Sequence, residues 1–383
     1  MPVEVKNDVL IYKGSNFFRQ RLLLSTLSGR SIRIEEIRST HDDPGLREYE
    51  VSLIRLLDKV TNGTRVELSE TGTSVYFQPG ILIGGQVSHT CSTQRGIGYY
   101  LEILLALGPF CKEPINAVLQ GVTHSDLDVS VDKIKTAALP VLLKFILVDD
   151  GLELKVVRRG APPLGGGEVV FKCPVRRHLR PLQWTKWGLV KRIRGVVYAL
   201  RVSPTMANRV VEAAKGVMLK FLPDVYVNTD QCRGSNAGKS PGFGISLVAE
   251  TNEKTFYCAE AKSVESGKGE ITLPEDLGRE CAQRLLDEIY RGGAVDSAFQ
   301  WLLALWMALG QKDVSECMIG PLSDYTITFL QHLKEYFGVM FKLEVQRSNL
   351  HEDSDDEEQV TPAQKVKMTC VGIGYVNISK RTL

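Results

Sequence analysis

Several patterns that mark common protein classes are missing from this 383-residue sequence. Its longest apolar stretches, such as residues 300–309, are too short to span a bilayer. The first residues, Met-Pro-Val-Glu-Val-Lys, lack the apolar region of a signal peptide. We therefore expect an intracellular protein without a membrane-spanning segment or a membrane partner.

The cysteine patterns of metal and disulfide sites are also absent. No two cysteines form a Cys-x-x-Cys pair, and none stands at a metal-ligand spacing from a histidine. We expect reduced cysteines, in the core or at the surface, in a reducing compartment, and neither a metal nor a cofactor. The eight positions are Cys91, Cys111, Cys173, Cys232, Cys258, Cys281, Cys317 and Cys370.

Patterns of nucleophilic catalysis and of nucleotide binding are scarce. None of the six histidines lies in a Ser/His/Asp or Cys/His arrangement, so each is expected to be an ordinary surface or core residue. Gly238-Lys239-Ser240 has only the last three letters of a P-loop, and no apolar strand leads into it. We interpret this segment, like Gly165-Gly166-Gly167, as a turn.

Charge is balanced overall but unevenly distributed. The formal net charge is +2, yet residues 155–201 hold twelve Lys/Arg and one acid, Glu168. Residues 352–358 hold six acids and no base. The basic stretch predicts either a face for an anionic partner or simply a solvated face, and the acidic stretch predicts a disordered loop at 351–360.

Helical and strand periodicity predicts a repeated unit in which a long helix is followed by a strand, a second helix and further strands. The leading helices start near Phe17, Thr93 and Val295, so the intervals are about 76 and 200 residues. The second interval predicts an insertion of about 100 residues between repeats two and three. The expected helices span residues 17–29, 46–61, 93–107, 129–145, 295–309 and 323–337, with strands at 31–37, 64–69, 74–79, 116–120, 317–319, 339–346 and 365–372.

The insertion has the pattern of a small α/β module. Strands are expected at 195–203, 224–229, 244–250 and 255–261, with helices at 205–221 and 275–290, the last helix returning to the core. The predicted fold class is thus α/β (α+β), with three related repeats and a smaller inserted domain. The expected domains are 1–183, holding repeats one and two; 184–280, the insertion; and 281–383, holding repeat three.

Two groups of basic residues are candidate binding residues. Arg19 and Arg95 are expected in the first turns of helices, where free N–H groups favour anions, and Arg38 ends a strand. If the three repeats share a sheet edge, these arginines could converge on an anion or RNA. A second group, Lys191, Arg192 and Arg194, could bind a phosphate backbone or an acidic segment of a protein partner.

In order along nearly the whole chain, short motifs resemble those of the RNA 3'-terminal phosphate cyclase family. They are Arg38 with Pro44–Arg47, Phe77–Gly80 with Gly84-Gly85, Arg159-Gly160 with Gly165–Val169, Pro241–Gly244 with Ala249–Thr251, and Asp296–Gln300. The resemblance implies that family's fold, with three α/β repeats and an inserted smaller domain. It also implies that Asp296 occupies the position of the family's nucleophilic histidine.

The departures from the family pattern cluster where the chemistry would occur. Tyr12–Asn16 replaces a glycine-rich run, Glu50 replaces a histidine, and Thr90–Thr93 replaces an Asp-Ile-Gly-Thr run. Arg19 is kept. A carboxylate cannot form the phosphoramidate that the family mechanism uses, so we expect no catalytic residue and no cyclase activity. Asp296 is more simply interpreted as a helix cap.

Whole-chain similarity with an altered site is typical of the cyclase-like, non-cyclase branch of the family. Membership of that branch implies a nucleolar ribosome biogenesis factor, acting in early pre-rRNA processing toward 18S rRNA within the small-subunit processome. It also implies a complex with a nucleolar GTPase, for which Lys191, Arg192 and Arg194 are our candidate contacts. The alternatives are an endoribonuclease that cleaves pre-rRNA with Asp296 as base, and a residual cyclase or ligase.

Overall fold

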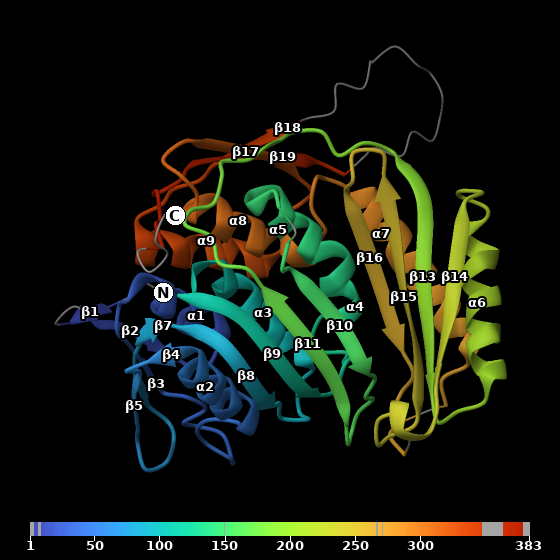
Figure 1. The fold of residues 1–383 in the computed structure, drawn as a ribbon, viewed down its shortest axis with the longest axis horizontal. Helices are drawn as coiled ribbons and strands as arrows, with labels where there is room; N and C mark the ends of the chain where they lie inside the picture. Colours follow the sequence, from blue (N-terminus) through green and yellow to red (C-terminus); the bar gives the residue numbers. More distant parts are fainter. Residues whose placement is uncertain are drawn as a thin grey trace.

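The computed structural model describes residues 4–6, 9–148, 150–265, 267–269, 271–346 and 363–377. Three similar α/β units form a core, and a smaller α/β module stands beside it (Figure 1). This is the mixed α/β architecture that the sequence predicts. The predicted acidic loop at 351–360 lies outside the described residues.

The three core units share one topology. In each, the first two strands are parallel, the last strand pairs antiparallel with the second, and the third strand occupies the edge. The sheet orders are β2-β3-β6-β5, β8-β9-β11-β10 and β12-β17-β19-β18, and β1 (Glu4–Lys6) extends the first sheet. The predicted threefold repeat is therefore confirmed at the level of strand order.

The bounds of the first unit are β2 (Val9–Lys13), α1 (Phe18–Ser28), β3 (Ile32–Glu35), α2 (Glu48–Val60), β5 (Arg65–Leu68) and β6 (Val75–Gln78), with the short pair β4 (Thr61–Asn62) and β7 (Ile81–Leu82). Those of the second are β8 (Gly84–Thr90), α3 (Ile97–Leu107), η1 (Gly108–Phe110), β9 (Glu113–Gly121), α4 (Val131–Lys133), η2 (Ile134–Ala138), α5 (Leu139–Ile146), β10 (Glu153–Arg158) and β11 (Gly167–Cys173). Those of the third are β12 (Gln183–Trp184), η4 (Ser297–Phe299), α8 (Gln300–Leu309), β17 (Val314–Ile319), α9 (Asp324–Phe337), β18 (Lys342–Gln346) and β19 (Lys365–Val371).

Two helices form the centre of the core. All residues of α3 and of α8 are buried, as expected of helices that are apolar on every side. Helix α3 contacts α1, and α8 contacts both α5 and α9, so the units share one continuous apolar core. Helix α3 begins at Ile97, not at Thr93 as predicted, because the preceding residues form a loop fixed by side-chain contacts of Arg95.

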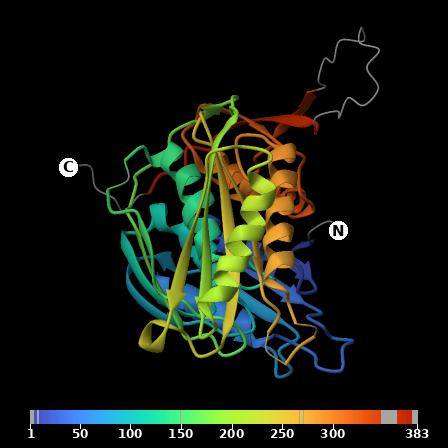
Figure 2. The ribbon, with the colours of Figure 1, turned by 90° about the vertical axis from the view of Figure 1, so that its right-hand side faces the viewer.

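The module has its own core. Its elements are β13 (Val190–Leu200), α6 (Pro204–Met218), β14 (Val225–Cys232), η3 (Gly234–Asn236), β15 (Gly242–Thr251), β16 (Phe256–Lys262) and α7 (Pro274–Arg291). The sheet order is β14-β13-β15-β16, and α6 and α7 cover one face (Figure 2).

Two expectations about the module differ from the structure. Strand β12 already belongs to the third unit, so the insertion lies inside that unit and not before it. Helix α7 was expected to return to the core, and the expected boundary at residue 280 falls inside it. Instead, α7 packs on α6, β15 and β16, because its apolar residues Leu277, Cys281 and Leu285 complete the module's core.

Glycine-rich loops join the module to the core. The amide of Lys239 donates to the carbonyl of Gly165 at 2.9 Å, and the amide of Leu164 donates to Ser240 Oγ at 3.1 Å. A Cβ atom on Gly238 would lie 2.4 Å from that Gly165 carbonyl oxygen. The two glycine motifs thus allow close contact of two backbones.

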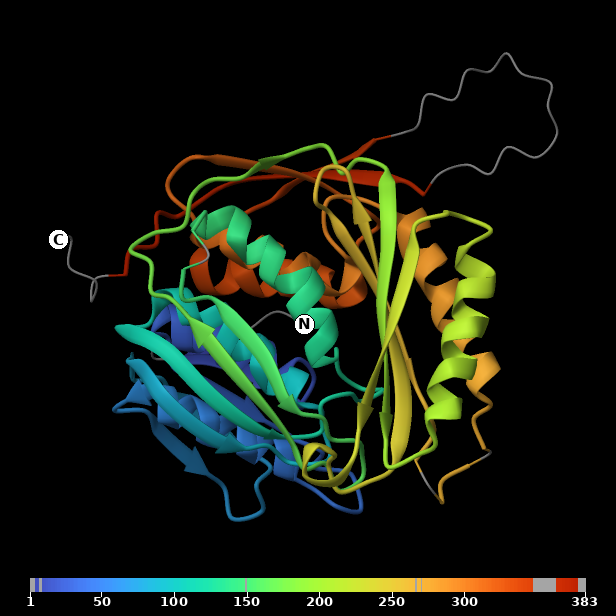
Figure 3. The same cartoon turned by 45° about the vertical axis from the view of Figure 1, so that its right-hand side comes forward.

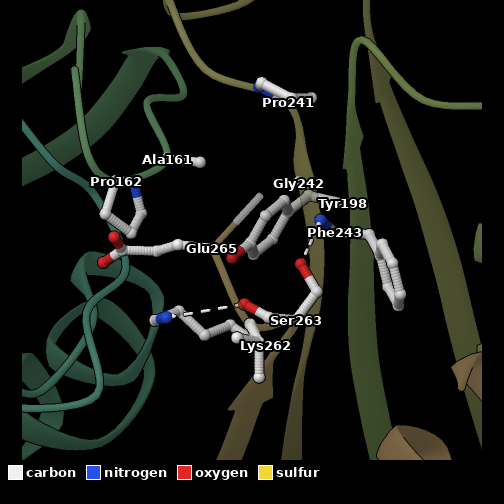
Figure 4. A pocket seen from close by; sticks show the side chains of 10 residues that line it. Ala161, Pro162, Tyr198, Pro241, Gly242, Phe243, Lys262, Ser263 and Glu265 are labelled. Carbon is white, nitrogen blue, oxygen red and sulfur yellow. Dashed lines mark hydrogen bonds between the residues drawn. The ribbon is translucent and has the colours of Figure 1, made fainter. Parts of the chain in front are cut away.

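The same junction is visible from other sides. Figure 3 shows the module's sheet beside β10 and β11 of the second unit. Close to the glycine loops, a small hollow separates Pro162 of the core from Tyr198 and Lys262 of the module (Figure 4). Lys262 forms an ion pair of 2.7 Å with Asp126 of the second unit, so the module is also held to the core by charge.

Candidate functional site: a cleft between the three units

The three core units meet at a cleft made of two adjoining hollows of about 260 and 380 Å³. Arg19, Arg95 and Tyr325 line both hollows, and each comes from a different unit. Arg19 lies in the first turn of α1, Tyr325 lies at the start of α9, and Arg95 lies two residues before α3. The predicted convergence of the units therefore brings Arg19 and Arg95 together.

The guanidinium of Arg19 is already surrounded by partners from the other two units. It forms an ion pair with Glu102 of α3 and donates to Tyr325 Oη at 3.0 Å. It also faces the rings of Tyr99, Trp301 and Tyr325, at 5.1 to 5.7 Å from their centroids. Burial acts to lower the pKa of Arg19, but the Glu102 carboxylate together with Tyr325 and Tyr99 holds the pKa above its usual value.

Arg95 has a comparable environment. Its Nε donates to both carboxylate oxygens of Asp128, at 3.0 and 2.9 Å, while the amide of Gly96 donates to the same carboxylate. The guanidinium lies 4.5 Å from the ring centroid of Tyr99 and 5.1 Å from that of Tyr49. Asp128 therefore both neutralises the charge of Arg95 and fixes the loop before α3.

Arg38 does not line the cleft but contacts two residues that do. It donates to both oxygens of Glu50 at 2.8 Å and to Tyr49 Oη at 3.2 Å. The hydrogen bonds that Arg38 donates to Glu50 raise the pKa of Arg38. Glu50 also caps α2 by accepting from the amide of Arg47 at 2.8 Å. Glu50, which stands where the family pattern has a histidine, is thus a buried carboxylate with a structural role.

All three candidate anion-binding arginines have a carboxylate partner within the chain. Glu102, Glu50 and Asp128 offset the charges of Arg19, Arg38 and Arg95. A cleft lined by neutralised guanidinium groups and aromatic rings attracts a phosphate far less than three free arginines would. Binding of an anion or RNA here remains a prediction.

Asp296 is buried and does not line the cleft, although Ser297 and Ala298 do. Its side chain caps η4 by accepting from the amide of Ala298 at 3.0 Å, which confirms the capping interpretation. Its second oxygen accepts from the amide of Cys258 on β16 at 2.8 Å. Lys133 of α4 lies 3.2 Å from the first oxygen.

This arrangement makes Asp296 a junction between the second unit, the third unit and the module. Burial acts to lower the pKa of Lys133, but the Asp296 carboxylate, helped by Cys258, Glu260 and Glu288, holds the pKa above its usual value. Lys133 also donates to the carbonyl of Cys258 at 2.9 Å. Both oxygens of Asp296 are occupied, and its side chain has 0% exposure, so a substrate cannot reach it.

The candidate partner-binding residues on β13 are half-exposed and also paired. Lys191 and Arg192 both contact Glu250 on β15, at 2.8 and 2.6 Å. Arg194 contacts Asp224 at 2.8 Å. Three cations thus face two acids, which leaves a much weaker excess of charge than the sequence implies. Their role in binding a partner remains a prediction.

Other expectations concern metal and membrane sites. All eight cysteines are buried and unpaired, so the core interpretation applies to each. Within the described ranges, no group of three or more His, Cys, Asp or Glu side chains is placed to hold a metal ion. Of the helices that the structure describes, none combines the length and apolarity needed to cross a bilayer.

Sequence reasoning missed the partners that complete the site. Glu102 lies in an apolar helix, where a single acid on a buried face is a sign of a buried ion pair. Asp128 precedes the short helix α4 and Lys133 lies in it, and neither residue carries such a sign. Their pairing with Arg95 and Asp296 depends on contacts across 33 and 163 residues of sequence.

The sequence profile of the RNA 3'-terminal phosphate cyclase family matches residues 10–343. The chain is 60% identical to the "Probable RNA 3'-terminal phosphate cyclase-like protein" of Drosophila melanogaster, over 100% of both chains. It is 57% identical to the "RNA 3'-terminal phosphate cyclase-like protein" of Homo sapiens, over 97% of each. It is 43% identical to the "rRNA processing protein rcl1" of Schizosaccharomyces pombe, again over 97% of each.

Proposed function

Because this chain belongs to the RNA 3'-terminal phosphate cyclase family, and because its relatives carry cyclase-like and rRNA-processing names, we propose that it is a ribosome biogenesis factor without cyclase activity. It acts in the nucleolus of the nucleus, in early pre-rRNA processing toward 18S rRNA. It does so as a binding component of the small-subunit processome, in complex with a nucleolar GTPase.

The observation that carries the non-catalytic part of this proposal is the environment of Asp296. A nucleophile must reach the atom that it attacks, and a general base must lie within about 3 Å of the proton that it removes. Asp296 instead uses both oxygens to hold Cys258, Ala298 and Lys133. The position that the family resemblance assigns to the nucleophile therefore has a structural role.

The same geometry weighs against the endoribonuclease alternative. That alternative made Asp296 the candidate base, and its side chain is shielded from solvent by the module and by α4. Glu50, a second acid near the cleft, is engaged by Arg38 and by the amide of Arg47. Neither carboxylate is placed to accept a proton from RNA.

Adenylylation tests the non-catalytic part directly. Purified protein would be mixed with labelled ATP, a divalent metal and an RNA with a 3'-phosphate, with an active cyclase as positive control. We expect neither covalent AMP on the protein nor a cyclic phosphate on the RNA. Either product, formed in proportion to the protein, would mean that a different nucleophile acts, and would contradict the proposed absence of cyclase activity.

Depletion and rescue test the role in processing. Removal of the protein from cells should reduce 18S rRNA and leave the large-subunit rRNA intact, and the wild-type chain should restore it. The GTPase should co-purify with the chain. Normal 18S levels after complete depletion would contradict the proposed function.

A further inference from the structure

Four cations come from three segments that backbone hydrogen bonds and a charge interaction bring together, and one of them, Lys144, lies over the indole of Trp184. Lys144 lies in the last turn of α5, and its Nζ stands 4.6 Å from the ring centroid of Trp184. Arg180 and Lys186 lie in the linker between β11 and β13, which passes over α5 (Figure 1). Lys254 lies in the turn between β15 and β16. We call Lys144, Arg180, Lys186 and Lys254 the linker patch.

Backbone contacts hold these segments together. The amide of Arg180 donates to the carbonyl of Phe145, beside Lys144, at 3.2 Å. The linker also exchanges hydrogen bonds with the β15–β16 turn, because Leu189 and Asn252 contact each other at 2.9 and 3.0 Å. The linker patch therefore spans the core and the module at a place where both are ordered by backbone hydrogen bonds.

The exposed members of the linker patch differ from several cations of the basic run, which are paired with acids. Arg159 is buried between Asp132 and Asp230, and Lys172 pairs with Glu153. In contrast, Arg180, Lys186 and Lys254 are exposed, and none has an ion-pair partner in the described part of the chain. Only the tertiary structure separates these free cations from the neutralised ones.

The two lysines at the centre of the patch lie close enough to affect each other. The pKa of Lys144 is lowered, first by burial and then by the charge of Lys254, and Glu253 offsets this only in part. Like charges that a neighbouring acid offsets only in part raise the local positive potential. A polyanion bound across the patch would relieve this repulsion.

We propose that the linker patch binds the phosphate backbone of RNA. The proposal rests on the proposed function for the choice of RNA among polyanions. Lys144 covers the Trp184 ring, and the indole is only 7% exposed, so bases cannot stack on it. The contacts are therefore electrostatic and independent of RNA sequence, with an anionic strand lying across both the core and the module.

Charge reversal of the exposed members tests the proposal. We would compare the wild-type chain with the triple variant Arg180→Glu, Lys186→Glu and Lys254→Glu, using a labelled single-stranded RNA of mixed sequence. Each lost phosphate contact should lower the salt slope of binding by about 0.7, so the variant's slope should fall by about 2. At low salt, its Kd should rise at least about tenfold.

The matched control carries the same change of charge elsewhere. Lys112, Lys220 and Arg233 are exposed and lie on other parts of the surface, so Lys112→Glu, Lys220→Glu and Arg233→Glu should leave the salt slope near wild type. Thermal unfolding would show that both variants are folded. Equal weakening in both variants, or in neither, would overturn the proposal, because net charge alone or another surface would then bind RNA.

A competition experiment with a polyglutamate peptide distinguishes RNA from an acidic protein segment as the ligand of the linker patch. We expect RNA to displace it from the wild-type chain. Binding of the peptide through the patch, without competition by RNA, would overturn the proposal in favour of an acidic protein partner. The outcome of the 18S rescue assay does not depend on these measurements. Normal 18S rRNA after depletion contradicts the proposed function. An unchanged RNA affinity in the triple variant contradicts only the role of the linker patch.

Discussion

Asp296 Oδ1 lies 3.2 Å from the ammonium group of Lys133, in a region where both side chains are almost entirely shielded from solvent. The two residues come from different units of the core, and both also contact the backbone of Cys258 in the module. A residue at the position of a family nucleophile thus contributes to the relative placement of three parts of the chain.

The first prediction concerns this junction. Asp296→Asn should lower the free energy of unfolding by about 3 kcal/mol or more, because Lys133 would remain buried without its counter-charge. Urea unfolding measures the loss. Asp224→Asn, which removes the exposed partner of Arg194, is the control and should cost far less, because solvent screens that pair. Equal losses in the two variants would contradict the role of the buried pair.

Restoring the family's histidine should not restore its chemistry. In Asp296→His, the imidazole would be placed among Lys133, Cys258 and Ala298, away from the cleft. We expect a less stable protein that forms no covalent AMP in the adenylylation assay. Labelling of the variant at that histidine would show that the position is accessible after all.

A further prediction tests whether the pairing of Arg19 with a carboxylate prevents the cleft from binding anions. Glu102→Gln removes the carboxylate beside Arg19, so sulfate or pyrophosphate should stabilise the variant more than the wild type. Thermal unfolding at increasing sulfate concentrations measures the difference. Glu48→Gln, an exposed change on α2, should respond like the wild type. Strong sulfate binding by the wild type would show that the ion pair does not prevent anion binding in the cleft.

Two glycine-to-alanine substitutions should have opposite effects on stability, because Gly238 lies against another backbone segment whereas Gly216 lies on an open helix surface. Gly238→Ala places a Cβ 2.4 Å from the carbonyl oxygen of Gly165 and should destabilise the chain by about 2 kcal/mol or more. Gly216→Ala, in α6 with no atom within 4 Å of its Cβ, should instead stabilise by about 0.5–1 kcal/mol. Thermal unfolding of the two variants would show whether the first is less stable and the second more stable than the wild type.

Stability should fall at mildly acidic pH because of His89. Burial and nearby Lys59 and Arg55 lower its pKa from 6.5 to about 4, and its Nε2 lies 2.9 Å from Ser52 Oγ. The unfolded chain binds a proton below about pH 6.5 and the folded chain only below about pH 4, so stability is lost as pH falls through this window. The full effect is about 3 kcal/mol.

Substitution isolates that histidine. In His89→Gln, the difference in urea midpoint between pH 7 and pH 5 should be smaller than in the wild type. The exposed His41 provides the control, because His41→Gln should retain the wild-type difference. If the buried substitution leaves the pH dependence unchanged, another group must cause it.

The sequence by itself determined the architecture. Apolar periodicity located helices such as α8, and the repeat intervals indicated three units and an insertion of about the observed size. Strand β12, with two residues, and β8, which begins at Gly84-Gly85, were missed because neither shows strand periodicity. Local pattern also predicted the capping role of Asp296, since a cap depends on neighbours in sequence.

Only the tertiary structure decided which charges are free. Whether Arg19 or Arg194 can bind an anion depends on Glu102 and Asp224, residues brought beside them by folding. Conversely, Lys144 and Lys254 belong to segments that no sequence pattern connects, yet their charges act on each other in the linker patch. The physical reason is that electrostatic attraction depends on distance and burial, whereas sequence separation limits neither.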